Sequence, residues 1–81
     1  MNENEDFFTT YDLNISAVLV ALGHKLDHIE RKQNNRALFF FKFSPAIKKV
    51  VQNYWKQDIK INPQKLFDSV KFLKNRLYSN L

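Results

Sequence analysis

A β-hairpin near the middle of the chain is the element that most constrains the fold. Residues 25–32 are charged and partly alternating, residues 33–35 read Gln-Asn-Asn, and residues 36–43 are strongly aromatic. Asn tolerates a positive φ better than most residues, so the polar triplet predicts a turn between two strands. Side chains alternate across a strand, so Phe39 and Phe41 share one face of the second strand. A Phe-rich strand in so small a protein is expected to supply much of its core.

The first strand of this hairpin has an irregular pattern. Leu26 and Ile29 have opposite parity, so they cannot both face the core from one regular strand. The segment 25–32 is therefore expected either to contain a bulge near Asp27-His28 or to become a strand only after its first residues.

Helical patterns flank the hairpin on both sides. Residues 11–22 are apolar almost all round, which predicts a central helix covered on most sides. Gly23, the only glycine in the sequence, stands where a left-handed C-cap would end that helix. Before the helix, Phe7–Thr10 is expected to be either a short edge strand or an extended lead-in, with Thr9 or Thr10 as the helix cap.

Two proline-containing pairs predict the starts of two further helices. Ser44-Pro45 and Asn62-Pro63 each place a capping side chain before a proline at the first helical position. The helices are expected over residues 45–56 and 63–79. Their core-facing arcs are expected to contain Ala46, Ile47, Val50, Val51, Tyr54 and Trp55 in the first, and Leu66, Phe67, Val70, Leu73 and Leu77 in the second.

The composition fits one domain without disulfides. The chain has 81 residues, of which 44% are hydrophobic and 15% aromatic, and it has no cysteine. A domain of this length buries roughly 60% of the surface that its unfolded chain exposes, so large side chains must dominate the core. The lack of cysteine excludes disulfides and thiolate chemistry, and it favours an intracellular, cytoplasmic protein.

The first six residues carry three acids and are expected to form a disordered acidic tail, while residues 7–81 fold as a single domain. Residues 1–6 lack the basic and then apolar pattern of a signal peptide. The longest apolar run, Ile15–Leu22, is far shorter than the ~20 residues that span a bilayer. No membrane partner is therefore expected.

The charge balance is basic, with 13 Lys and Arg against eight Asp and Glu and a formal net charge of +5. Such a balance favours anionic partners, nucleic acid above all, because binding releases counterions. The alternative is that the charge serves solubility, since small proteins encoded by A/T-rich genomes are often rich in Lys and Asn. Net charge alone does not decide between the two.

Basic side chains are expected to gather at the hairpin tip and on the outer sides of the last two helices. A charged face is most often simply a solvated face, and the functional interpretation is a surface that contacts phosphates. The spacing does not match a helix-turn-helix. The candidate nucleic-acid-binding residues are Arg31, Lys32, Arg36, Lys48, Lys49, Lys56, Lys65, Phe72 and Arg76.

Two aromatic residues stand apart from the expected core. Phe72 falls on the polar side of the last helix, at about the angle of Ser69 and Arg76, and an exposed aromatic beside cations suits base stacking or a protein contact. Alternatively, that helix packs on two sides, or Phe72 covers the second face of the hairpin. Phe40 lies on that second face. Phe40 and Phe72 are therefore candidate interface residues for a protein partner or a homodimer.

Catalytic and metal sites are not expected. His24 and His28 lie four residues apart with Asp27 and Glu30 nearby, a spacing that would suit a metal only on a helix. Alternation along a strand would scatter these four side chains over both faces. A single glycine cannot build a phosphate-cradling loop, and no serine belongs to a nucleophile elbow. No catalytic residue, metal ligand or cofactor is predicted, and the protein is not expected to be an enzyme.

Several short motifs are spread along the chain from residue 8 to residue 78. They are Phe8-Thr9-Thr10 before Asp12-Leu13, the Ala17–Gly23 helix end, Gly23-His24-Lys25-Leu26 before Ile29-Glu30-Arg31, Phe39 and Phe41, Val51 with Tyr54-Trp55, and Pro63 with Leu66-Phe67, Leu73-Lys74, Arg76 and Tyr78. Through them the chain resembles an uncharacterised small-domain family of bacterial and phage genomes, catalogued as a domain of unknown function. The resemblance implies a setting among mobile or phage-associated genes and assigns no functional residue.

Together these patterns predict an α+β domain with the order helix, β-hairpin, helix, helix, with or without a short N-terminal strand. The preferred function is non-enzymatic nucleic-acid binding with little sequence specificity. The alternative is a protein-interaction or dimerisation module that uses the sheet edge and its exposed aromatic residues.

Overall fold

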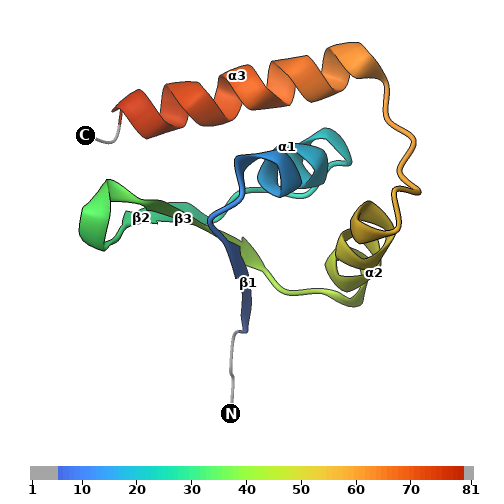
Figure 1. Ribbon diagram of the computed structural model, residues 1–81, viewed down its shortest axis with the longest axis horizontal. Helices are drawn as coiled ribbons and strands as arrows, with labels where there is room; N and C mark the ends of the chain where they lie inside the picture. The colour runs from blue at the N-terminus through green and yellow to red at the C-terminus, as the bar shows by residue number, and fades with distance from the viewer. Residues whose placement is uncertain (1–5, 80–81) are drawn as a thin grey trace.

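The computed structural model describes residues 6–79 and contains three strands and three α-helices (Figure 1). The acidic tail predicted for residues 1–6 lies outside the described residues except for Asp6, whose carbonyl oxygen accepts a hydrogen bond from the Phe43 N–H at 3.0 Å. The elements are β1 (Phe7–Thr10), α1 (Leu13–Ala21), β2 (His28–Arg31), a 3₁₀ turn (Gln33–Asn35), β3 (Ala37–Lys42), α2 (Pro45–Trp55) and α3 (Pro63–Ser79).

The order of the strands in the sheet differs from their order in the sequence, and all neighbouring strands are antiparallel. Its strand order is β1-β3-β2, and both outer strands run antiparallel to β3. β1 and β2 are therefore parallel to each other, joined through α1, with β3 inserted between them as in a split β-α-β unit. Phe7–Thr10 is thus a true strand, and the helix–hairpin–helix–helix order predicted from the sequence is confirmed.

The irregular first strand of the hairpin begins late. β2 starts at His28, and the preceding Asp27 N–H donates to the Phe40 carbonyl at 2.7 Å. Leu26 lies before the strand, which removes its conflict of parity with Ile29 without a bulge in β2. In the turn, Asn34 and Asn35 have φ values of 64° and 61°, the left-handed conformation that Asn tolerates.

The ends of α1 depend on specific caps. The Asp12 carboxylate, and neither predicted threonine, caps the start: its Oδ1 accepts from the Asn14 N–H at 2.7 Å and the Ile15 N–H at 3.3 Å. Thr10 bonds to the capping residue itself: its hydroxyl oxygen accepts a hydrogen bond from the Asp12 N–H at 3.0 Å. The helix therefore begins at residue 13, two residues later than predicted. At the other end, Gly23 has φ 98° and forms the expected left-handed cap.

The two later helices begin where the sequence predicts. Ser44 Oγ accepts from the Ile47 N–H at 3.2 Å, and Asn62 Oδ1 accepts from the Gln64 N–H at 2.8 Å. α2 ends with Gln57 in a left-handed conformation, φ 60°, a position that glycine usually fills.

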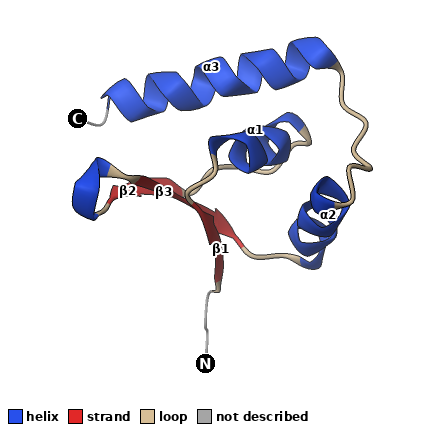
Figure 2. Ribbon diagram, viewed as in Figure 1, coloured by secondary structure: helices blue, strands red, loops and turns tan. Residues whose placement is uncertain are grey.

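The core lies where α1 meets the sheet and the other two helices (Figure 2). Every residue from Ile15 to Leu19 is buried, as the all-round apolar pattern predicts. Phe39 and Phe41 project from β3 onto this helix, and Leu73 of α3 completes the same cluster. No helix within residues 6–79 is long and apolar enough to cross a membrane.

Two aromatic residues assigned to the core-facing arcs are not in the core. Trp55 is 66% exposed and Phe67 is 59% exposed. Each lies at the edge of its helix's apolar arc, beyond the width of surface that α1 covers. Trp55 and Phe67, predicted to lie in the core, are therefore surface residues near the junction of α1, α2 and α3.

Candidate functional site

The solvent side of α2 carries three lysines, with an aromatic ring at one edge of the set. At 3.6 residues per turn, its exposed members fall within an arc of about 120°. On the opposite side of the helix, Ile47 is buried and Val50 packs against the core. This exposed set, here called the α2 face, consists of Lys48, Lys49, Gln52, Trp55 and Lys56.

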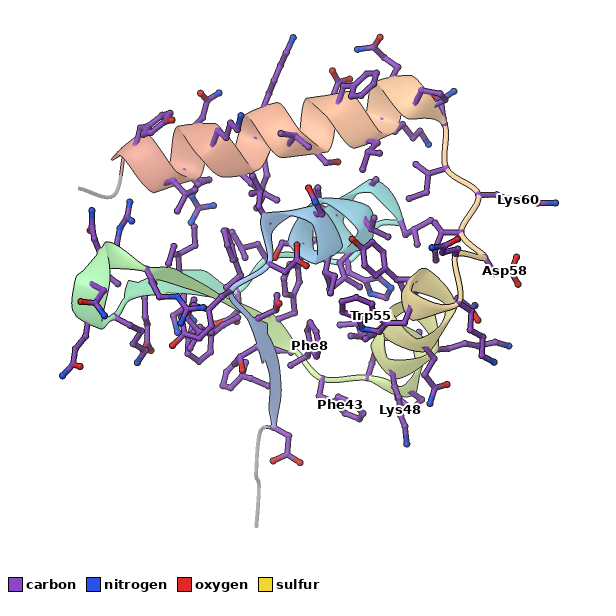
Figure 3. All side chains as sticks on the ribbon, in the orientation of Figure 1. Phe8, Phe43, Lys48, Trp55, Asp58 and Lys60 are labelled. Atoms are coloured by element: carbon purple, nitrogen blue, oxygen red, sulfur yellow. The ribbon has the colours of Figure 1, made fainter. Side chains whose placement is uncertain are left out.

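The α2 face carries three lysines and no acidic side chain. α2 contains no acidic residue, and within residues 6–79 no ion pair involves Lys48, Lys49 or Lys56. Lys42 is also exposed, just before the helix. In Figure 3, Lys48 extends away from the body of the protein near the start of α2. The charges on this side of the molecule are therefore available to an external anion.

A pocket of about 510 Å³ lies directly beside the α2 face. The rings of Tyr54 and Trp55 meet edge to face, with centroids 5.1 Å apart, at the wall that α2 contributes. A neighbouring hollow shares Tyr54 and reaches the exposed ring of Phe67. The lining residues of the main pocket are Val18 of α1, Tyr54 and Trp55 of α2, Gln57, Ile59 and Ile61 of the following connection, and Leu66 of α3.

Sequence reasoning missed this pocket because it assigned Trp55 to the core. A signal was present: on a helical projection Trp55 lies only about 20° from Lys48 and about 60° from Gln52. A tryptophan that borders a lysine on the polar side of a helix is positioned to be a surface residue. The connection after α2 gave a second signal, since Ile59 and Ile61 alternate with Asp58 and Lys60.

The three cations of the hairpin tip are already engaged within the protein. The Arg31 guanidinium donates to the Asn35 carbonyl and to the Leu77 carbonyl, both at 3.2 Å, and so ties the hairpin to the last turn of α3. The Arg36 guanidinium lies over the Tyr11 ring, 3.8 Å from its centroid. These contacts give both arginines a structural role that the sequence pattern did not show.

Lys32 completes the hairpin-tip set and is also paired. Its ammonium group donates to Glu30 Oε1 at 2.7 Å. This contact raises the pKa of Lys32 and lowers the pKa of Glu30. Arg31, Lys32 and Arg36 are close in sequence, but their contacts within the protein keep them from forming a free basic surface.

The predicted residues of α3 lie on a second, separate surface. Phe72 is 41% exposed, and the Arg76 guanidinium is 5.8 Å from its ring centroid. Ser69, expected on the same polar side, is buried, with its hydroxyl donating to the Lys65 carbonyl at 2.8 Å. α3 thus packs more widely than a single stripe, and Phe72 partly covers the segment after α1, lining a small hollow there.

The outer face of the sheet is partly exposed and aromatic. Figure 1 shows α1 and α3 on the other side of the sheet. The Phe40 ring stacks on the His28 ring at 4.2 Å, and Phe7 meets both edge to face, at 5.7 Å from Phe40 and 5.9 Å from His28. Phe7 remains 37% exposed. Phe40, a predicted interface residue, therefore lies at the centre of an aromatic cluster on the outer face of the sheet.

His28 is held between two carboxylates on that face. Its Nδ1 lies 2.6 Å from Asp27 Oδ2, and its Nε2 lies 3.1 Å from Glu30 Oε2. The hydrogen bond to Asp27, reinforced by the one to Glu30, raises the pKa of His28. Of the four residues expected to scatter, three meet at the His28 ring: Glu30 lies two residues along the strand and so shares its face, and Asp27 precedes the strand and reaches back to the ring. The carboxylates contact opposite ring nitrogens, and within residues 6–79 no cluster of His, Asp and Glu is arranged to hold a metal ion.

Comparison with known proteins places this fold in a family. A family model described as Domain of unknown function (DUF5659) matches residues 5–79. The chain belongs to the DUF5659 family. The match spans the three strands and the three α-helices described, from β1 to α3, so the family's domain is the fold described above. No curated protein and no solved structure matches the chain.

Proposed function

We propose that this DUF5659 domain binds nucleic acid without catalysis and with little sequence specificity, through the α2 face. The observation that carries the proposal is that Lys48, Lys49 and Lys56 share one exposed helix face with Trp55 and with no acid. Lysines on a helix contact phosphates irrespective of sequence, and an exposed aromatic adds contact with bases.

The remaining predicted cations take lesser roles in this proposal. Lys65 and Arg76 on α3 add to the long-range positive potential. Arg31, Lys32 and Arg36 at the hairpin tip contribute charge while keeping their intramolecular contacts. The proposal also places the protein in the cytoplasm of bacteria or phage-infected cells, in accord with the family resemblance and with a cysteine-free sequence suited to a reducing compartment.

The test is fluorescence anisotropy of labelled DNA and RNA with the wild type and two charge-reversed variants. The first variant is Lys48→Glu with Lys49→Glu. The matched control is Lys71→Glu with Lys74→Glu on the exposed side of α3. Each pair lowers the formal net charge equally, so only the position of the charge differs.

We expect the α2 variant to lose at least about 10-fold in affinity at low salt and the α3 variant to lose much less. Three phosphate contacts predict a slope of log affinity against log salt of about −2 to −3, or about 20- to 40-fold between 50 and 200 mM salt. Equal losses in the two variants would show that net charge alone drives retention. No binding by the wild type at low salt would refute the proposal.

The outer sheet face supports a second candidate function, a protein-interaction or dimerisation module. Phe7, Phe40 and Leu38 leave a partly apolar surface that a second copy would cover, while Phe72 offers a separate contact on α3. Light scattering after size exclusion tests this function: the wild type is expected to dimerise, and Phe40→Lys is expected to be a monomer. A monomeric wild type at high protein concentration would rule out the dimer.

A further inference from the structure

We propose that the pocket beside Trp55 takes a single unstacked nucleobase, so that the preferred ligand of this protein is single-stranded nucleic acid. This inference rests on the proposed function, because the lysines of the α2 face hold the phosphates on either side of the bound base. It adds the class of nucleic acid and the base-binding residues.

The size and lining of the pocket suit a flat aromatic ligand. At about 510 Å³ it falls in the range of small-molecule sites, roughly 300–1,000 Å³. Ile59, Ile61 and Leu66 give it an apolar floor. Trp55 offers an open ring face, since it is 66% exposed and meets Tyr54 only edge to face. Stacking on such a ring is tolerant of base identity, in agreement with low sequence specificity.

The side-chain amide of Gln57, a residue that lines this pocket, can bond to the edge of a base. The Gln57 amide has both donors and an acceptor, which allows it to pair with any base. The Gln57 backbone is held in its left-handed conformation: its N–H donates to the Tyr54 carbonyl at 3.0 Å, and the Asp58 N–H donates to the Asn53 carbonyl at 2.9 Å. These bonds fix the point from which the amide reaches the pocket.

Charge around the pocket favours a polyanion as the carrier of the base. Lys56 adjoins Trp55 in sequence, and Lys60 lies between the two lining isoleucines. In Figure 3, Asp58 and Lys60 both point away from the helices, so the acid of this connection does not face the pocket. An apolar pocket bordered by lysines fits a base flanked by phosphates.

The geometry discriminates against duplex. A paired base is stacked on both faces and cannot present one of them to Trp55 unless it is unstacked, which costs a few kcal/mol. Single strands offer splayed bases at little cost, and proteins that bind them combine aromatic platforms with a basic surface. Duplex DNA can therefore reach the lysines of the α2 face but not the pocket.

The experiment uses three probes of equal length: a short oligothymidylate, the same sugar-phosphate backbone without bases, and a duplex. Trp55 is the only tryptophan in the chain, so its emission reports on the pocket directly. Anisotropy of the labelled probes reports binding at any surface. We expect oligothymidylate to bind at least about 5-fold more tightly than the abasic backbone and to quench Trp55, because one stacked base contributes about 5- to 150-fold.

Variants separate the pocket from the phosphate contacts. Trp55→Ala is expected to bind oligothymidylate no better than the abasic backbone, while Trp55→Phe keeps part of the preference. Tyr78→Ala, which truncates an exposed aromatic side chain on α3, is the matched control and is expected to keep all of it. Because Trp55 is largely exposed, Trp55→Ala is expected to remain folded, as circular dichroism will show.

Each outcome has a defined meaning. Equal affinity for the abasic backbone and oligothymidylate, without quenching of Trp55, would overturn the base-pocket inference while the proposed phosphate binding stands. Tighter binding of the duplex than of the single strand would overturn it as well. Failure of all three probes to bind at low salt would overturn both proposals.

Discussion

The opposite faces of β3 provide a matched pair of substitutions in adjacent residues. Phe41 is fully buried among the core residues, while Phe40 lies on the outer face of the sheet. Phe41→Ala and Phe40→Ala remove the same atoms from neighbouring positions of one strand. Any difference in their cost therefore measures how differently the two faces of the sheet are covered.

The expected magnitudes follow from the contacts. Truncating a fully buried Phe costs about 3–5 kcal/mol in free energy of unfolding, from lost transfer energy plus the cavity left behind. Phe40 loses its stacking on His28 and its edge contact with Phe7, each worth about 0.5–1.5 kcal/mol, together about 1–3 kcal/mol. An 81-residue domain has a total stability of about 4–12 kcal/mol. Phe41→Ala therefore removes a larger part of it than Phe40→Ala does.

Urea unfolding measures both costs as free energies, and thermal unfolding measures them as changes in Tm; far-ultraviolet circular dichroism follows both transitions. At about 4–8 °C per kcal/mol for a domain of this size, Phe41→Ala should lower Tm by at least about 12 °C, and Phe40→Ala by clearly less. Equal losses for the two variants would refute the reasoning. They would mean that the outer face of the sheet is covered in solution as fully as the inner face, and would favour the dimer described above.

Three further predictions concern the chain's polar contacts and backbone strain. The pKa of His28 is raised, chiefly by Asp27, so the contribution of His28 to stability is complete below about pH 6.5 and is lost as pH rises through the folded-state pKa. Between about pH 6 and 8.5, Tm should therefore fall more in the wild type than in His28→Gln. An equal fall in the two proteins would contradict this. Gln57→Gly should raise the free energy of unfolding by about 0.5–1 kcal/mol in a urea titration, because relief of a left-handed residue gains about 1–2 kcal/mol and the extra backbone entropy of glycine takes back part of it. A loss of stability would show that the Gln57 side chain contributes more than the strain costs. Asp12→Ala should cost about 1 kcal/mol through the lost cap of α1, whereas Asp12→Asn should cost much less; identical costs would point to charge and not to capping.

Local signals determined most of what could be predicted about the fold. Ser44-Pro45, Asn62-Pro63 and Gly23 each act within a few residues, and the alternation of Phe39 to Phe41 needs only the geometry of one strand. Asp12 was missed because three neighbouring side chains could each have capped α1. Which of them does so depends on the direction in which the chain runs from the end of β1 to the start of α1.

The candidate site was only half predictable, for a different physical reason. The exposed side of α2 was predicted to hold Lys48 and Lys49 because charged residues must face water. The exposure of Trp55 was not predicted, since an apolar arc shows the direction of the core but not how wide a surface α1 covers. Long-range contacts were invisible as well: nothing local indicates that Arg31 binds the carbonyl of Leu77, 46 residues away.

The placement of α1 has a consequence for the order in which the chain can fold during synthesis. α1 is apolar on almost every side, and the helix that packs most extensively on it, α3, is synthesised after the other elements described. Until residues 63–79 have been made, Ala17 and Val18 lack the α3 side chains that lie beside them, and the nascent chain exposes an apolar helix. The fold is therefore completed after translation of its final helix, and shortened chains that lack α3 are expected to aggregate.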